Sequence, residues 1–189
     1  ATSGYLDGIN YSVFLDGNLI SSSNSYVYTI NNSDKGEHNI TISATDGFLS
    51  VFREWELIIS RPETSGFDGS TTDFGSLGLD ELENVSNVIL EKTGKGKIEF
   101  LDSLNLTGVV DLNNNVKIER GIVAINMQEI PQLNKKARIT LTGLRYSTIP
   151  EIFYSGEFTT NPLLINQKCD FCKILNYTPN PTTNGVIVF

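Results

Sequence analysis

Six asparagines stand at the first position of an Asn-X-Ser/Thr triplet, the pattern that accepts an N-linked glycan. A glycosylated asparagine lies on the surface of an exported protein, because the sugar is bulky and water-soluble. A chain rich in Asn and Thr gives some triplets by chance, but six exceed that expectation. Asn180 is excluded because Pro181 follows it. The sequence therefore predicts covalent N-glycans on Asn10, Asn31, Asn39, Asn84, Asn105 and Asn176.

The two cysteines lie close together, in the run Cys169-Asp170-Phe171-Cys172. Three roles fit such a pair: a disulfide in an exported protein, two free thiols, or a redox or metal site. A redox pair needs a βαβ context, and zinc needs two further ligands, for which the only histidine, His38, is remote in sequence. We favour the disulfide. Because the closed loop is short, the bond is expected to shape a loop more than to stabilise a domain.

Asp111, Asn113 and Asn115 place side-chain oxygens at alternate positions, as half of a calcium-binding loop does. The glycine and the distal glutamate of a complete EF-hand loop are missing. The competing interpretation is a solvated turn rich in Asn and Asp. The sequence therefore predicts no cofactor other than calcium, and it places calcium at Asp111, Asn113 and Asn115 as a hypothesis.

No group of residues has the pattern of a catalytic site. His38 has no serine or cysteine nucleophile in a recognisable motif and is expected on the surface. Glu54 and Glu56 are a carboxylate pair, as glycoside hydrolysis requires, but they alternate with Trp55 as the solvated residues of a strand do. We predict that the chain has no catalytic residues and is not an enzyme.

The length, net charge and apolar content of the chain limit the classes of molecule that it is expected to bind. The chain has 189 residues, a net charge of −8 and a pI near 4.6. Nucleic acids and anionic membranes need a basic surface, so neither is expected as a partner. No run approaches the ~18 apolar residues of a membrane span. The sequence has no signal peptide and ends on an apolar run at residues 185–189, so we expect an excerpt of a longer protein.

The elements that must position these residues are β-strands. Residues 36–47 alternate with a period of two, and an Asp-Gly turn closes them, which predicts a half-buried strand. Its apolar face is expected to hold Ile40, Ile42 and Ala44. A hairpin turn is predicted at Asp16-Gly17. Further strands are expected at residues 11–15, 26–30 and 48–59, the last with Trp55, Leu57 and Ile59 on one face.

The pattern Gly36-Glu37-His38, Ile40, Ile42, Ala44-Thr45-Asp46-Gly47, followed by Trp55, Leu57 and Ile59, carries a family resemblance. It resembles the last strands of the Ig-like domains of archaeal and bacterial surface proteins, which include polycystic-kidney-disease (PKD) type repeats. The Trp-Asp-Phe-Gly-Asp-Gly motif of the PKD type is missing, which favours the general Ig-like class. The resemblance implies an Ig-like β-sandwich for residues 1–62.

The second half of the chain, residues 63–189, is predicted to be another β-domain. Its first residues, 63–75, are small and polar and are expected to form a linker or a long loop. Strands are expected near residues 88–90, 97–101, 116–119, 121–125, 137–142, 152–154, 173–175 and 186–189. Residues 80–84 are expected to form one helical turn, and residues 178–185 a turn. The runs at 82–88, 97–100 and 133–141, with the cysteine pair and the last strand, resemble modules of large archaeal surface proteins.

These observations predict an all-β chain made of two tandem antiparallel β-sandwich (Ig-like) domains. The predicted function is that of a structural module in an extracellular cell-surface glycoprotein assembly, an S-layer or a filament. Its expected partners are copies of itself or neighbouring surface proteins, contacted through exposed sheet edges or the last strand. The alternative is an adhesin or a carbohydrate-binding accessory module of a secreted protein.

Overall fold

A computed structural model describes residues 8–30, 34–108 and 110–189 of the chain. Antiparallel β-strands make up most of its regular structure, and short helical turns make up the rest. This confirms the all-β class that the alternating patterns predict. The chain divides into two compact units, residues 1–60 and 61–189, and each unit has its own sheets.

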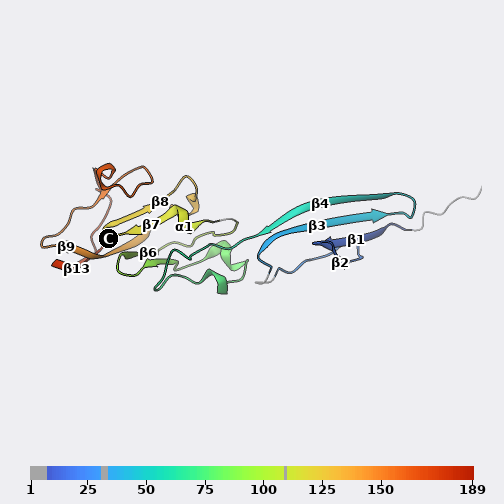
Figure 1. The fold of residues 1–189 in the computed structure, drawn as a ribbon, viewed down its shortest axis with the longest axis horizontal. Coiled ribbons are helices and arrows are strands. Elements are labelled where there is room, and N and C mark those ends of the chain that lie inside the picture. Colours follow the sequence, from blue (N-terminus) through green and yellow to red (C-terminus); the bar gives the residue numbers. More distant parts are fainter. Residues whose placement is uncertain (1–7, 31–33, 109) are drawn as a thin grey trace, which may run out of the picture. The chain divides into compact units, whose positions relative to one another are not determined.

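The first unit contains one four-stranded antiparallel sheet with the strand order β2-β1-β3-β4 (Figure 1). Its strands are β1 (Asn10–Leu15), β2 (Asn18–Ser21), β3 (Gly36–Thr45) and β4 (Ser50–Ile59). The predicted turn at Asp16-Gly17 joins β1 to β2, and both residues have positive φ, as a tight hairpin turn requires. β4 is an outer strand, which pairs with β3 alone.

The pairing register of β3 confirms the face predicted for its apolar residues. Ile40 lies opposite Leu15 of β1 and Trp55 of β4. Opposed residues of antiparallel strands point to the same side of the sheet, and residues two apart on one strand do so as well. One face of the sheet therefore collects alternate residues of β1, β3 and β4, including Ile42 and Leu57.

The segment between β2 and β3 covers part of this face, but it is not a strand. The alternation of Tyr26, Tyr28 and Ile30 predicts one, whereas residues 22–30 form no ladder. Tyr26 and Tyr28 instead line a small pocket of about 180 Å³ together with residues of β1 and β3. The Tyr28 hydroxyl donates a hydrogen bond to Asp34 Oδ2 at 2.8 Å. The strand prediction was wrong because this alternation reflects packing onto a sheet, not pairing within one.

The described part of the first unit shows one sheet and no second sheet packed on it. Its buried hydrophobic side chains are Val13 and Ile59. Trp55 and Ile42 lie on the predicted inner face, yet they keep 47% and 36% of their surface exposed. Alternation therefore fixes which side of the sheet a residue occupies, whereas burial requires a layer above the sheet. Among the described residues, the segment 23–28 provides part of such a layer.

The second unit is built on a five-stranded sheet with the order β12-β13-β9-β6-β5. Its strands are β5 (Ile89–Lys92), β6 (Gly96–Phe100), β9 (Ala137–Tyr146), β12 (Asn176–Thr178) and β13 (Asn180–Val188). Two hairpin-like pairs accompany it: β7 (Val116–Glu119) with β8 (Ile122–Ile125), and β10 (Phe153–Tyr154) with β11 (Gln167–Lys168). The short helices are η1 (Phe74–Ser76), η2 (Glu81–Asn84), α1 (Leu112–Asn115), η3 (Pro131–Leu133) and η4 (Pro162–Leu164).

A continuous hydrophobic core lies inside the second unit. Leu90 of β5 and Ile98 of β6 are fully buried. β6 contributes the alternate residues Ile98 and Phe100, β5 contributes Leu90, and η2 adds Leu82 at the predicted helical turn. The buried members of the core are Phe74, Leu82, Val85, Val88, Leu90, Ile98, Phe100, Leu104, Leu106, Val110, Leu112, Val116, Ile118, Ile130 and Leu133. In the second unit, therefore, packed side chains cover the sheet, whereas the sheet described in the first unit is largely uncovered.

The segment at 63–75 is not a free linker. Asp68 N–H donates to Glu91 C=O at 2.9 Å, and Thr72 N–H donates to Ile89 C=O at 2.9 Å, so the segment runs along the outer edge of β5. Phe74, at its end, is 2% exposed and belongs to the core. The small polar composition that suggested a linker instead allows a tight path beside a strand edge, which the segment protects.

The end of the chain pairs on both sides. β13 lies between β12 and β9, so the last strand is internal to the sheet and does not present a free edge. The strand expected at 173–175 lies slightly later, at β12. The predicted turn at 178–185 is also shorter, because β13 already begins at Asn180 and pairs there with Tyr146. The last strand is therefore not an available contact element, contrary to the sequence-based prediction.

Candidate functional site

The described asparagines of the predicted glycan acceptors all lie on the surface. Asn10 and Asn39 are exposed on strands of the first unit, and Asn84, Asn105 and Asn176 are exposed in the second. Asn31 lies outside the described residues. At Asn39 and Asn105 the side-chain oxygen accepts a hydrogen bond from the threonine hydroxyl two positions later, at 3.2 and 2.6 Å. Surface exposure meets one requirement for modification, and glycosylation itself stays a prediction.

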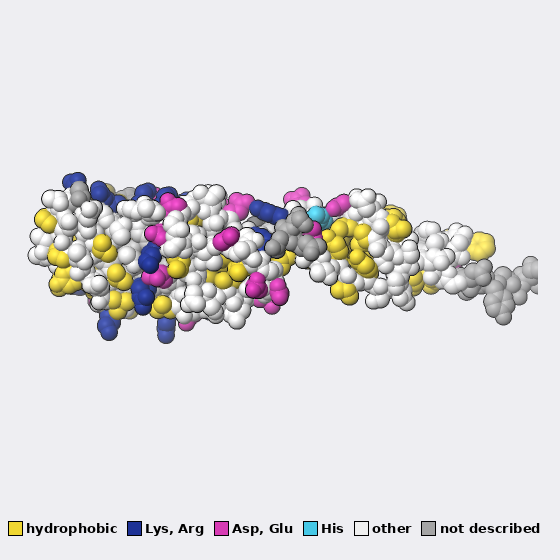
Figure 2. Space-filling model, turned by 90° about the horizontal axis from the view of Figure 1, so that it is seen from below, with side chains coloured by type: hydrophobic (Ala, Val, Ile, Leu, Met, Phe, Trp, Pro, Cys, Tyr) yellow, Lys and Arg dark blue, Asp and Glu magenta, His cyan; other side chains and the backbone are white. Residues whose placement is uncertain are grey.

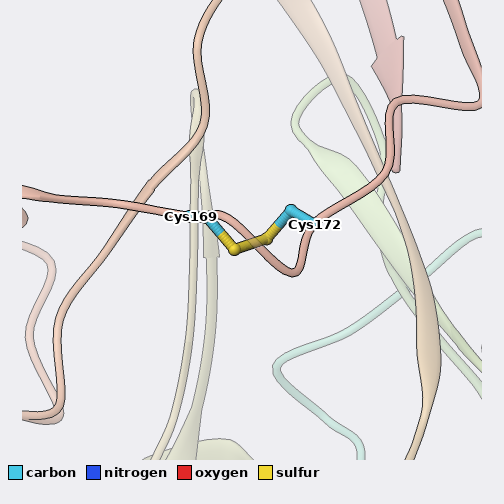
Figure 3. Close-up of a disulfide and its surroundings, with 2 residues drawn as sticks. All are labelled: Cys169 and Cys172. Atoms are coloured by element: carbon cyan, nitrogen blue, oxygen red, sulfur yellow. A yellow bond between two sulfur atoms is a disulfide. The ribbon is translucent and has the colours of Figure 1, made fainter.

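The cysteine pair forms the disulfide that we favoured from the sequence (Figure 3). The bond joins Cys169 to Cys172 with a Cα–Cα distance of 5.5 Å and closes a tight loop after β11. Phe171, inside this loop, meets Tyr154 of β10 edge to face, with ring centroids 5.2 Å apart. The disulfide therefore holds an aromatic side chain against the β10–β11 pair.

The oxygens considered for calcium already accept hydrogen bonds within the chain. Asp111 caps α1, because its carboxylate accepts from Asn114 N–H at 3.0 Å and from the Asn114 amide at 2.6 Å. Asn113 Oδ1 accepts from Gly66 N–H at 2.8 Å, and Asn115 Oδ1 accepts from the Asn126 amide at 3.0 Å. The two hydrogen bonds from Asn114 hold the pKa of the Asp111 carboxyl below its usual value. The residues thus have a structural role, and calcium binding there stays a prediction.

His38 forms a charged cluster on the first sheet. Its Nδ1 lies 2.8 Å from Asp16 Oδ2, and its Nε2 lies 3.0 Å from the Asp34 carbonyl oxygen. Both neighbours are acceptors, so the doubly protonated ring satisfies both contacts. The hydrogen bond to Asp16 is the main cause that raises the pKa of His38, and the bond from His38 is the main cause that lowers the pKa of Asp16. The cluster ties the β1–β2 turn to β3.

The outer edge of β4 is the most exposed strand surface of the first unit. Asp46 N–H donates to Leu49 C=O, which places the odd-numbered residues of β4 in hydrogen-bonded pairs with β3. The even-numbered residues, such as Phe52 and Glu54, therefore direct their backbone N–H and C=O outward. Phe52 is 71% exposed and Val51 is 68% exposed. Hydrophobic side chains also reach the surface over this unit in the space-filling view (Figure 2).

A cavity of about 780 Å³ opens in the second unit, within the range of ~300–1,000 Å³ typical of ligand sites. One wall is the continuous run 121–128 with β8, and the other is the run 150–159 with β10. Side chains of β9 and β13 also line the cavity, among them Leu141 and Ile187. Phe171 and Cys172 of the disulfide loop complete the lining.

The cavity is mainly apolar, and its charged groups are few. They are Arg145, Glu151 and Glu157, and Glu151 is engaged by Lys168 Nζ at 2.6 Å. This ion pair raises the pKa of Lys168. Such a lining favours an uncharged ligand, because burying an unpaired charge is costly.

Sequence reasoning missed this cavity, because its walls come from segments that are far apart along the chain. One signal was present. The run Ile122-Val123-Ala124-Ile125 has no polar residue at alternate positions, so both of its faces had to meet apolar surroundings.

Searches for metal sites, membrane helices and related proteins do not identify a function for the chain. In the part of the chain that the structure describes, no three His, Cys, Asp or Glu side chains gather as metal ligands, and no helix has the length and apolarity to cross a membrane. No protein-family model matches the sequence, and neither the curated proteins nor the solved structures give a match.

Proposed function

We propose that this chain is a non-enzymatic structural module of an extracellular cell-surface glycoprotein assembly, such as an S-layer or a filament. The observation that carries the proposal is the outer edge of β4, a ten-residue strand with exposed apolar side chains whose outer side pairs with no other strand among the described residues. The tandem Ig-like assignment of both units is part of this proposal. The first unit, with its one open sheet, is then completed by a neighbouring molecule.

A second copy of the chain is the partner we assign to this edge. Edge strands pair readily with another strand, and proteins that avoid such pairing keep their edges short or covered. β2 and β12 are short, and residues 68–72 cover β5, so β4 is the long open edge among the four- and five-stranded sheets of the described residues. Arg53, Glu54 and Glu56 on β4 restrict which strands can pair with it, because like charges placed opposite each other are unfavourable.

Two further observations support an extracellular setting. The disulfide between Cys169 and Cys172 is typical of oxidising compartments. The five described glycan acceptors are all exposed, so a glycosylating enzyme can reach them without unfolding the chain. These two features support the location, whereas β4 supports the assembly.

The assembly is tested by sedimentation velocity over a concentration series, with Glu54→Pro as the decisive variant. Glu54 directs its N–H away from β3, so proline removes a donor at the outer edge while the ladder with β3 stays intact. Glu54→Thr is the matched control, because it removes the same charge and keeps the N–H. We expect the parent and Glu54→Thr to associate and Glu54→Pro to stay monomeric. Association that survives Glu54→Pro would contradict a contact through β4.

Glycosylation is tested on protein purified from its native source by mass spectrometry of peptides containing each acceptor. We expect glycans on several of the exposed asparagines. Unmodified peptides at all six positions would remove the glycoprotein part of the proposal while leaving the assembly test unaffected.

An adhesin is the second candidate, and the cavity of the second unit favours it. Sugar recognition by stacking needs aromatic rings that share a plane, whereas the rings of Tyr154 and Phe171 meet at 65°. That pair does not offer a flat platform. Retention of a monomeric chain on immobilised glycans would support the carbohydrate-binding form of this candidate, and passage without retention would exclude the glycans tested.

A further inference from the structure

We propose that the cavity of the second unit binds an extended peptide segment of a partner protein, which adds as a strand between β8 and β10. This inference does not depend on pairing through β4. The cavity is bounded by two strands that each have a partner on one side only: β8 pairs with β7, and β10 pairs with β11. Residues of both strands line the cavity.

The cavity lies along the open edges of both strands. Every residue from 121 to 128 lines it, whereas β7 contributes none. In the same way, every residue from 150 to 159 lines it, whereas β11 contributes none. Side chains of a strand alternate between faces, so an unbroken run of lining residues means that the cavity runs beside the backbone.

Backbone groups on β8 point into this space. Asn126 N–H donates to Asn115 C=O at 2.8 Å, which sets the alternation of the β7–β8 ladder. Ala124 and Ile122 then bond to β7, and Val123 directs its N–H and C=O to the open edge. Residue Val123 thus offers one donor and one acceptor to an incoming strand.

The β10 edge offers the same pair of groups. Cys169 N–H donates to Ile152 C=O at 2.9 Å, so the β10–β11 ladder uses Ile152 and Tyr154. Phe153, between them, directs its backbone N–H and C=O away from β11. An extended chain is the ligand that can satisfy donors and acceptors on both sides at once, because its own N–H and C=O groups point alternately to its two edges.

The side-chain lining indicates the chemistry of this peptide. Ile139 and Leu141 of β9 and Ile187 of β13 present apolar surface to the cavity. Phe171, which is 76% exposed, lies at the disulfide loop. A bound strand would direct every second side chain toward the apolar lining. The ligand is therefore an uncharged segment with apolar residues at alternate positions.

The occupant is assigned to a different polypeptide because the described residues of this chain have no spare segment of that kind. The alternating stretches of β1, β3, β6, β9 and β13 are paired within their own sheets, and β4 is paired with β3. The remaining alternating stretch, residues 26–30, has Tyr26 and Tyr28 against the first sheet. A strand that fills the gap needs both of its edges free, which the paired strands do not offer, and residues 26–30 are held against the first sheet by their side chains.

The experiment uses the oxidised full chain and a set of fluorescein-labelled peptides of ~7 residues, the length of an ordinary strand. The peptides alternate Val, Ile or Phe with Thr. Each has two controls: a version with its apolar residues grouped, and a version with N-methyl groups on its backbone nitrogens. Fluorescence anisotropy should show saturable binding of alternating peptides, weakened about tenfold or more by N-methylation, since each lost hydrogen bond weakens binding.

Two matched variants locate the site. Phe153→Lys places a charge at the cavity wall on a side chain that is 45% exposed, and Leu101→Lys places one on a side chain that is 58% exposed and outside the cavity. Circular dichroism checks that both fold. We expect Phe153→Lys to weaken peptide binding about tenfold or more and Leu101→Lys to leave it unchanged.

Several results would overturn the inference. No saturable binding by any alternating peptide would do so, and so would equal binding of the N-methylated peptides, which would show an apolar site without strand pairing. Equal loss in both lysine variants would place the site elsewhere. Self-association that Phe153→Lys abolishes and Glu54→Pro does not would make a second copy the occupant, and the assignment to a partner protein would then be wrong.

Discussion

The two units use the same kind of strand and differ in what covers it. In the second unit, β6 contributes the alternate side chains Ile98 and Phe100 to a closed core, and Ile98 is fully buried. In the first unit, β3 and β4 alternate just as regularly, yet Trp55 keeps nearly half of its surface exposed. The alternating pattern is thus necessary for a buried sheet face but does not provide the layer that buries it.

The edges of the two units differ in the same way. Residues 68–72 run along the outer edge of β5 and satisfy its backbone through Thr72 and Asp68. The outer edge of β4 has no such segment among the described residues. The edge of the five-stranded sheet at β5 is therefore covered from within its own unit, whereas the edge of the first sheet at β4 exposes both apolar surface and backbone groups that a neighbour can cover.

The largest expected effect comes from Leu90→Ala in the second unit. Leu90 is fully buried, and removing a buried leucine side chain costs about 2–5 kcal/mol through lost burial and the cavity left behind. Chemical denaturation followed by circular dichroism measures this loss. Fluorescence of Trp55, the only tryptophan, reports on the first unit and should be unchanged. The control Leu101→Ala, at an exposed position, should cost far less.

Removing the disulfide should have a smaller effect. The double variant Cys169→Ser with Cys172→Ser opens a loop closed by residues only three apart, for which chain entropy gives about 2 kcal/mol or less. The melting temperature of the second unit measures this change. A loss of stability as large as that of Leu90→Ala would show that the disulfide stabilises the core of the second unit, and not only the loop that it closes.

The stability of the first unit should depend weakly on pH through His38 and Asp16. The raised pKa of His38 means that the folded state favours the protonated ring. Its contribution to stability is complete below the usual value of 6.5 and is lost as the pH rises through the raised folded-state pKa. Asp16 has a lowered pKa, so its contribution is lost as the pH falls below 3.8.

Because His38 is the only histidine, this loss above pH 6.5 should appear in the Trp55 signal of the first unit. His38→Gln should make that signal insensitive to pH in the same window. An equal pH response in His38→Gln would assign the effect to other groups.

The smallest expected change in stability is that of Val51→Thr. Val51 is 68% exposed on β4, and threonine keeps the branched side chain that suits a strand, so the free energy of unfolding should change by ~0.5 kcal/mol or less. The matched variant Val88→Thr buries a hydroxyl at a position that is 1% exposed and should cost more. Equal costs at both positions would show that the first sheet is covered in solution.

The local features of the fold were predictable where one strand decides them. The face of Ile40 and the turn at Asp16-Gly17 follow from alternation and turn chemistry alone. Features that depend on distant segments were not predictable. The path of residues 68–72 beside β5 is one example, because nothing in its small polar residues indicates which edge it follows.

The candidate sites likewise differ in whether their residues are neighbours in the sequence or come from distant segments. The disulfide was predictable because its two cysteines are neighbours in the sequence. The cavity was not, because Val123 and Phe153 face a common space only after β8, β9 and β10 have been placed. The hydrogen bonds of Asn113 were likewise hidden, since its partner Gly66 comes from a segment much earlier in the chain.

The position of β13 has a consequence for how the protein is made. This strand is the last to be synthesised in its unit, yet it lies between β9 and β12 in the sheet. Until residues 180–188 have left the ribosome, β9 has one open side and β12 has no partner. The five-stranded sheet therefore closes late, and the incomplete unit presents an unpaired strand edge that a chaperone can shield during synthesis.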